Sequence, residues 1–370
     1  MSRQRGVRPS RRTGIARPAL ALALASLAAG MLGGLLRAGV VLPLQADWIG
    51  QAAVWHAALM ICAFLGTVIG IERAVALKHP AAIVAPLVCA VGGALLLAGQ
   101  AQAAHASFVL AGLAFVAVNA AIVRRQQAAH TWLLLLGAFS WLGGNVLQVS
   151  GTGAAAVLPA WLAFLVLTIA AERLEMTRLM RRRPGAEALL LWLLGALLLG
   201  SALCASWPAL GGVVFGLALA ALAGWLMAFD IARRTVLAGG LARYMAVCLL
   251  AGYGWLAMGG LAWAAASAGL PAARDTALHA VGLGFVFSMV MGHAPVILPA
   301  VARVKLAFGH AFYLPLLALH GSLLLRVGGG AFDPALRRLG AALNSAAIVL
   351  FLLTVIGAAL VWRRRHGALQ

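Results

Sequence analysis

The sequence predicts an all-α, polytopic membrane protein with 12 transmembrane helices. Three observations support this prediction. The 370 residues are 64% hydrophobic and only 10% charged, and their mean hydropathy is +1.01. Apolar segments of about 20 residues, the length that crosses a hydrocarbon core of about 30 Å, recur along the whole chain. Basic residues gather in alternate connections between these segments, and no long stretch is left for a soluble domain.

The predicted spans follow one another with short connections that contain glycine, proline and charged residues. In chain order they are 18–36, 51–71, 81–100, 105–123, 129–149, 155–171, 187–206, 209–229, 244–268, 276–300, 308–326 and 339–361. We expect one membrane domain at residues 17–362, a disordered basic N-terminus at 1–16 and a basic tail at 363–370. A cleaved signal peptide is the alternative for the N-terminus, but the first apolar segment is longer than a typical signal sequence.

The basic residues predict how the spans are oriented. Threading from a cytoplasmic N-terminus leaves only five of the 28 Lys and Arg residues outside. These five are Arg37, Arg274, Arg326, Arg337 and Arg338. Because cytoplasmic loops retain Lys and Arg, we expect both termini in the cytoplasm. The net charge of +20 is then explained by topology and by anionic lipids, without a nucleic-acid partner.

Two predicted spans far apart in the chain each carry one histidine at a similar depth from the outer face. These are His56 and His279. A charge at the bilayer centre costs roughly 2.5–3.5 kcal/mol, so an ionisable side chain there is a candidate for function. Neutral imidazole avoids much of this cost and is also the form that binds metal. The pair predicts the two axial ligands of a haem b, and His320 is a third candidate at a similar depth.

The span at 276–300 carries a stripe on one helical face. His279, Gly282, Met289 and His293 follow one another at helical spacing. At a rise of 1.5 Å per residue the two histidines are about 21 Å apart, so they cannot ligate one iron. His293 and His320 are therefore candidates for a second site. Gly282 leaves room for a flat macrocycle or for close helix packing.

Two prolines follow His293 in the same span. Pro295 and Pro299 each remove a backbone hydrogen bond, so they predict a broken helix with free carbonyl groups. A broken helix beside a histidine is also typical of a transporter site. The main alternative to a haem protein is therefore a secondary transporter of a small molecule or metal ion. A haem-less structural or assembly protein is a third reading, and it leaves the matched histidine depths unexplained.

Methionines and arginines extend the candidate site. Met60 and Met289 lie four residues from His56 and His293. Thioether with imidazole suits copper(I) or a sixth haem ligand, so copper is kept as an option beside ordinary packing. Arg37 and Arg326 end two spans on the outer side. Guanidinium groups there could hold haem propionates in a bidentate fork, or anchor the helices at the interface.

An internal repeat predicts how the helices are arranged. Residues 63–73 (AFLGTVIGIER) and 163–173 (AFLVLTIAAER) match at an offset of 100 residues. Both close an outside-to-inside helix, so the repeat has a period of four helices and predicts equivalent inner positions for the second, sixth and tenth spans. The Glu-Arg pairs at 72–73 and 172–173 are expected to be interfacial ion pairs, and a proton uptake point is the alternative.

This pattern resembles two known families. Three four-helix arcs with histidines on helices 2 and 10 are similar to the catalytic subunit of haem-copper oxidases, but the sixth and seventh predicted spans hold none of the expected histidines. The chain more closely resembles the NnrS family. Trp55-His56-x-x-x-Met60 is similar to the family's W-H-x-H-E-M, although Ala58 and Leu59 replace its second His and Glu. Ala277-Leu278-His279-Ala280 and Gly309-His310 resemble its A-L-H-A and G-H elements.

The NnrS-like resemblance implies a multi-pass protein of the bacterial inner membrane that binds haem b, with copper as a further option. It implies a role in nitric oxide metabolism, nitrosative stress or denitrification, with nitric oxide or another diatomic molecule as ligand. No catalytic residue follows from the resemblance. Sensing, shielding and conversion of the ligand all stay open.

Overall fold

The computed structural model describes residues 11–43, 46–176 and 184–367. Their regular structure is helical, and no strand occurs within these three stretches. Twelve helices are long and apolar enough to cross a membrane, which confirms the predicted all-α polytopic fold. Of the predicted disordered N-terminus, residues 1–10 lie outside the described part, and the first helix begins already at Arg11.

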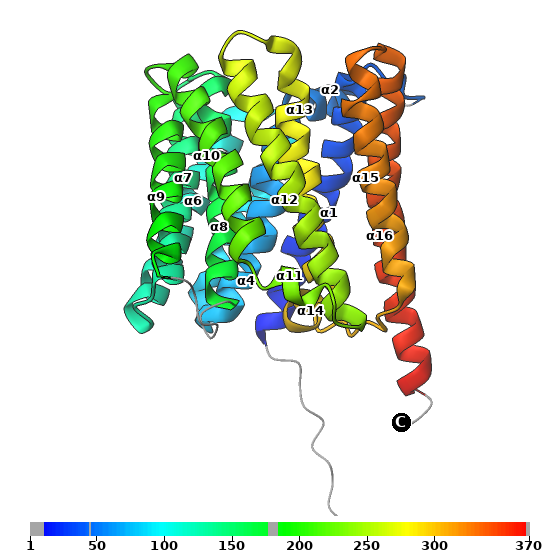
Figure 1. Cartoon of the computed structure of the whole chain (residues 1–370). Helices are drawn as coiled ribbons and strands as arrows, with labels where there is room; N and C mark the ends of the chain where they lie inside the picture. Colours follow the sequence, from blue (N-terminus) through cyan, green and yellow to red (C-terminus); the bar gives the residue numbers. More distant parts are fainter. Residues whose placement is uncertain (1–10, 44–45, 177–183, 368–370) are drawn as a thin grey trace, which may run out of the picture.

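The helices run nearly parallel to one another and form one bundle (Figure 1). Spans 1 to 6 comprise α1 (Arg11–Arg37); α3 (His56–Ala58), η1 (Leu59–Gly66) and α4 (Thr67–Leu77); η2 (Pro80–Ile83) and α5 (Val84–Leu97); α6 (Ala101–Arg125); α7 (Ala129–Val149); and α8 (Ala154–Met176). Spans 7 to 12 comprise α9 (Ala186–Leu203); α10 (Pro208–Phe229); α12 (Gly240–Ser267); η3 (Pro271–Ala273), α13 (Arg274–His279), η4 (Ala280–Phe287) and α14 (Ser288–Val301); η5 (His310–Phe312), α15 (Tyr313–Val327) and η6 (Gly329–Ala331); and α16 (Pro334–Gly367). Two short helices, α2 (Asp47–Val54) and α11 (Ala232–Thr235), lie in connections.

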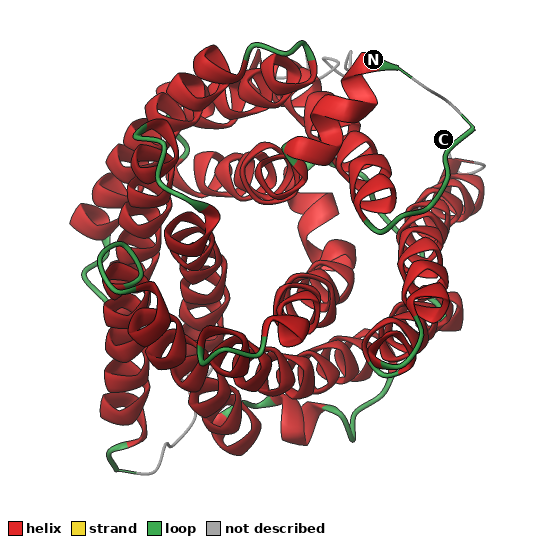
Figure 2. Ribbon diagram, turned by 90° about the horizontal axis from the view of Figure 1, so that it is seen from above, coloured by secondary structure: helices red, strands yellow, loops and turns green. Residues whose placement is uncertain are grey.

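Spans 2, 6 and 10 form the interior of the bundle, as the four-helix repeat predicts. Within their most apolar windows, 67%, 83% and 61% of the residues are buried inside the protein, and no other span exceeds 50%. Viewed along the helix axes, the remaining helices surround an inner group (Figure 2). We call spans 2, 6 and 10 the inner helices.

Two of the inner helices change from α to π geometry directly after their histidines. In span 2, η1 is π-helical and begins three residues after His56; in span 10, η4 is π-helical and begins at Ala280, next to His279. π-Helical turns are uncommon and concentrate at functional sites. Periodicity of the sequence did not predict them, because a π turn changes the hydrogen-bond spacing without altering the apolar character of the segment.

Span 2 also starts later than expected. The predicted span 51–71 begins within α2, but the helix is interrupted at Trp55, whose φ of −100° and ψ of 20° are not helical. The membrane helix then starts at His56 and continues to Leu77, where Lys78 adopts a left-handed conformation with φ of 57°. His56 is therefore the first residue of an inner helix.

The predicted break at the prolines of span 10 is wrong. Pro295 and Pro299 both lie inside α14, which continues to Val301. A transmembrane helix tolerates proline where neighbouring groups satisfy the freed carbonyls. The irregular segment of this span is η4, which precedes both prolines by two turns or more.

Candidate functional site

A cavity of about 710 Å³ lies between the three inner helices at the end of the bundle that carries His56. Helices α1, α7, α15 and α16 and the connection between α7 and α8 also contribute to its wall. Most of the lining is apolar, including Phe64, Trp161 and Phe287, one from each inner helix. Its volume falls in the range of about 300–1,000 Å³ that is usual for small-molecule and cofactor sites. We call this end of the bundle the cavity end.

His56 and His279 both line this cavity, although 223 positions separate them in the sequence (279 − 56). His56 Nδ1 lies 2.7 Å from the carbonyl oxygen of Gly30, and His279 Nδ1 lies 2.9 Å from the carbonyl oxygen of Asp275. A carbonyl can only accept, so each Nδ1 donates its proton and Nε2 keeps a lone pair. This is the tautomer in which a histidine offers Nε2 to a metal, with Nδ1 held by a second group.

Two glycines create the space around the histidine rings. A β-carbon at Gly34 would lie 2.8 Å from Cε1 of His56, so the ring occupies the room that a side chain of α1 would fill. A β-carbon at Gly282 would have no atom within 4 Å, and this residue lines the cavity. Gly282 therefore leaves the face of span 10 beside His279 open toward the cavity. A flat ligand could approach the backbone closely there.

Arginines surround the cavity, and one carboxylate joins them. Four of the five arginines that the sequence predicts on the outer side line it: Arg37, Arg274, Arg326 and Arg337. Asp275 is the one acidic residue among the lining residues. The positive excess favours an anionic ligand, because guanidinium groups at the edge of a low-dielectric space attract carboxylates strongly.

The two arginines that the sequence singled out behave differently. Arg326 is buried and makes two hydrogen bonds to the carboxylate of Asp275, from Nε at 2.9 Å and from Nη2 at 2.8 Å. Arg37 is exposed, and its Nη1 donates to the carbonyl oxygen of Ala53 at 3.3 Å. Arg326 is thus committed to Asp275, whereas Arg37 retains further donors that could reach a ligand carboxylate.

His293 and His320 do not line the cavity. His293 Nδ1 lies 2.7 Å from the carbonyl oxygen of Met289, and its Nε2 lies 3.0 Å from Nη2 of Arg173. Both ring nitrogens of His293 are therefore engaged. His320 Nδ1 accepts a hydrogen bond from the indole Nε1 of Trp255 at 2.8 Å, so its proton is on Nε2.

The two candidate methionines also separate. Met60 lines the cavity one turn after His56. Met289 is buried away from it, with its methyl group against Gly252 of α12. Among the described residues, no three His, Cys, Asp or Glu side chains gather as a metal-binding group. A haem held by two axial imidazoles requires only the pair that the cavity contains.

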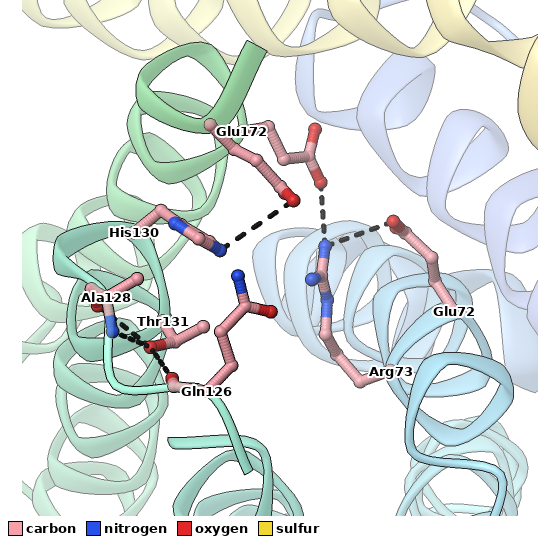
Figure 3. A network of polar contacts seen from close by, with 8 residues as sticks. Glu72, Arg73, Gln126, Ala128, His130, Thr131 and Glu172 are labelled. Carbon is pink, nitrogen blue, oxygen red and sulfur yellow. Dashed lines mark hydrogen bonds and ion pairs between the residues drawn. The ribbon is translucent and has the colours of Figure 1, made fainter. Parts of the chain in front are cut away.

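At the opposite end of the bundle the inner helices are tied together by charged side chains. Arg73 Nη2 lies 3.0 Å from Oε1 of Glu72 and 2.8 Å from Oε1 of Glu172 (Figure 3). Arg173, one residue further on α8, reaches His293 of span 10. Both arginines are buried. The expected interfacial ion pairs are therefore bridges between inner helices, and we call this group the charge network.

Sequence reasoning missed several residues that line the cavity or hold its histidines. Asp275 lies four residues before His279, and this spacing on a helix was a usable signal. Gly30 and Gly34 lie in a cluster of small residues on span 1, which is typical of close helix packing. Arg274 and Arg337 were assigned to the outer side, but nothing local indicated that they approach one cavity.

One family model matches the chain over most of its length. The model of the family described as a domain of unknown function (DUF8744) matches residues 17–360. The chain belongs to this family. The match includes eleven spans in full, most of the twelfth and all residues that line the cavity, so it extends far beyond one motif. No curated protein matches the chain at a significant level.

Proposed function

We propose that this DUF8744 member is a membrane haem protein in which His56 and His279 are the axial ligands of a haem b. The observation that carries the proposal is that both line one cavity, each with Nδ1 held and Nε2 left to bind. The apolar walls suit a porphyrin, and Gly282 leaves the surface of span 10 beside His279 open to it. Arg37 at the cavity wall is the proposed partner of a propionate. Bound there, the haem supplies an iron that can exchange electrons or take up a diatomic ligand.

The biological role follows from the resemblance to the NnrS family and from charge. We propose a bacterial inner-membrane protein with both termini in the cytoplasm and the cavity end outward, since basic residues are concentrated at the other end. Nitric oxide or a similar diatomic molecule is the proposed ligand, in nitrosative-stress or denitrification-linked metabolism. A neutral diatomic molecule can reach an apolar cavity from the bilayer or from the outer compartment.

A difference spectrum tests the haem assignment. The protein is expressed with ample haem and purified in detergent, and a reduced-minus-oxidised absorption spectrum is recorded. We expect a sharp six-coordinate b-type signal in the wild type, and loss of that signal in both His56→Ala and His279→Ala. A colourless, folded wild-type protein would overturn the proposal.

His320→Ala is the matched control. His320 is also a partly buried histidine in a membrane helix, but it bonds to Trp255 and does not line the cavity. Its variant should keep the full six-coordinate signal. Loss of the signal in His320→Ala as well would mean that the spectrum reports general folding and not ligation by the cavity pair.

A transporter is the second candidate, and one observation favours it. The cavity separates the inner helices at one end, while the charge network joins them at the other. This is the arrangement of a carrier open to one side, with the site in the cavity near η4 and not at the prolines. A colourless protein that binds an anionic solute, with binding lost in His279→Ala, would favour this candidate over the haem protein.

A further inference from the structure

The two candidate ligands are held by very different groups. His279 Nδ1 lies 2.9 Å from the carbonyl oxygen of Asp275 and 3.1 Å from Oδ1 of the same residue. Arg326 of α15 donates two hydrogen bonds to this carboxylate, from Nη2 at 2.8 Å and from Nε at 2.9 Å. His279, Asp275 and Arg326 therefore form a continuous chain that fixes the imidazole from two helices. A guanidinium paired in this fork leaves the carboxylate little freedom to turn away.

His56 is held by a neutral group and not by a charged one. Its Nδ1 has one partner in the structure, the carbonyl oxygen of Gly30 at 2.7 Å. That carbonyl is neutral and belongs to the interior of α1. His56 also follows directly after the interruption of the helix at Trp55. Among the described residues, no carboxylate forms a hydrogen bond or ion pair with its ring.

The partner of Nδ1 sets both the orientation and the strength of a histidine ligand. A carboxylate accepts a charge-assisted hydrogen bond, which is roughly twice as strong as one to a neutral carbonyl, and it makes the imidazole a better electron donor. Resting on the proposed function, we propose that His279 is the permanent axial ligand, positioned by Asp275 and Arg326, and that His56 is the ligand that leaves when a diatomic molecule binds.

The step involves no electron or proton transfer. With a haem bound, His56 Nε2 would give up one bond to iron, the incoming molecule would form one bond in its place, and His56 would keep its Nδ1 proton. His279 stays in place throughout. Asp275 and Arg326 are positioning residues, because they act through His279.

Carbon monoxide is the probe that separates the two histidines. It binds reduced haem and reports an available coordination position by its absorption spectrum. We expect His56→Ala to retain haem in a five-coordinate form that binds carbon monoxide at least 10-fold faster than the wild type. We expect His279→Ala to lose most of its haem. Retention of haem in His279→Ala together with its loss in His56→Ala would reverse the assignment.

Asp275→Asn tests the positioning role without removing a ligand. An amide oxygen can still accept from His279, but the charge is lost, so we expect a raised reduction potential and haem affinity lower by about 10- to 100-fold. Asp47→Asn, an exposed carboxylate outside the cavity, is the matched control and should change neither. Because a thermal-unfolding assay identifies variants that fail to fold, the potential is compared only among folded proteins.

The outcomes distinguish the two proposals. If the wild type is colourless, the haem assignment fails and this inference fails with it. If the wild type carries haem but Asp275→Asn matches Asp47→Asn in potential and affinity, the haem assignment stands and the positioning role is refuted. If both histidine variants bind carbon monoxide equally fast, the distinction between a permanent and a leaving ligand is refuted.

Discussion

The inner helices surround a cavity at one end and are joined by charged side chains at the other. At the cavity end, spans 2, 6 and 10 stand apart around about 710 Å³, and their histidines each keep one nitrogen uncommitted. At the other end the same helices are joined through Arg73, Glu172, Arg173 and His293. Span 10 carries a histidine at each end. His279 at the cavity end keeps Nε2 uncommitted, whereas both ring nitrogens of His293 at the other end are engaged.

The difference teaches that burial of an ionisable group does not by itself indicate a ligand site. In the charge network, opposite charges satisfy one another, and the group acts as a clamp between helices. In the cavity, arginines outnumber the single carboxylate and imidazole nitrogens remain unused. A ligand site is therefore expected where polar groups are held in position and still have a donor or acceptor that no protein group uses.

Removing the cation of the clamp should have the largest effect on stability. Arg73→Met keeps an apolar stem but leaves Glu72 and Glu172 near one another without their shared partner. Breaking a buried pair in this way costs about 3 kcal/mol where the carboxylates are partly exposed, as they are here. The thermal-unfolding midpoint in detergent should fall clearly.

Arg124→Met provides the control for this prediction, since Arg124 is exposed at the same end of the bundle. It should unfold like the wild type. The double variant Arg73→Met with Glu172→Gln should recover part of the loss, because one of the two uncompensated charges is gone. Equal midpoints for Arg73→Met and the wild type would show that the charge network does not clamp the helices.

Filling the cavity should abolish binding while leaving the clamp intact. Leucine at Gly282 meets no protein atom at its β-carbon and extends into the cavity, so we expect a folded protein with haem content reduced at least 10-fold. Gly254→Leu is the control, because Gly254 is exposed on α12 and also has no atom within 4 Å. Normal haem content in Gly282→Leu would contradict a site beside this glycine.

A smaller effect is expected from crowding one histidine. Alanine at Gly34 would place its β-carbon 2.8 Å from Cε1 of His56, so the imidazole must shift from its place. We expect a folded protein that keeps haem but binds carbon monoxide several-fold faster, since His56 is held less well. Gly143→Ala, at an exposed glycine with no neighbouring atom within 4 Å, should leave the rate unchanged.

The fold could be predicted from sequence much further than the site. Apolar length marks each span whatever its neighbours are, and the repeat at 63–73 and 163–173 correctly predicted which helices are innermost. That arrangement also places His56 and His279 in the wall of one cavity. The holders of these rings could not be predicted, because Gly30 acts through its carbonyl group, which every residue possesses.

Two predictions from patterns along a single helix failed because contacts with other helices decide the outcome. Two prolines predicted a break, but α14 continues through Pro295 and Pro299. His293 lies on the same helical face as His279. Its position on that face could not predict that Arg173, from another helix, bonds to its Nε2. A pattern along one helix identifies a face, and only packing decides whether that face meets a cavity or an ion partner.

The smallest effect is expected at His320, which tests whether depth in the membrane or access to the cavity defines a ligand. His320 and Trp255 stack with an interplanar angle of 8° and share one hydrogen bond at 2.8 Å. His320→Ala removes this bond at a cost of about 1 kcal/mol. The unfolding midpoint should fall slightly, and the reduced-minus-oxidised spectrum should stay that of the wild type. A changed spectrum with an unchanged midpoint would mean that His320 reaches the haem, and the division between held and available histidines would then have to be redrawn.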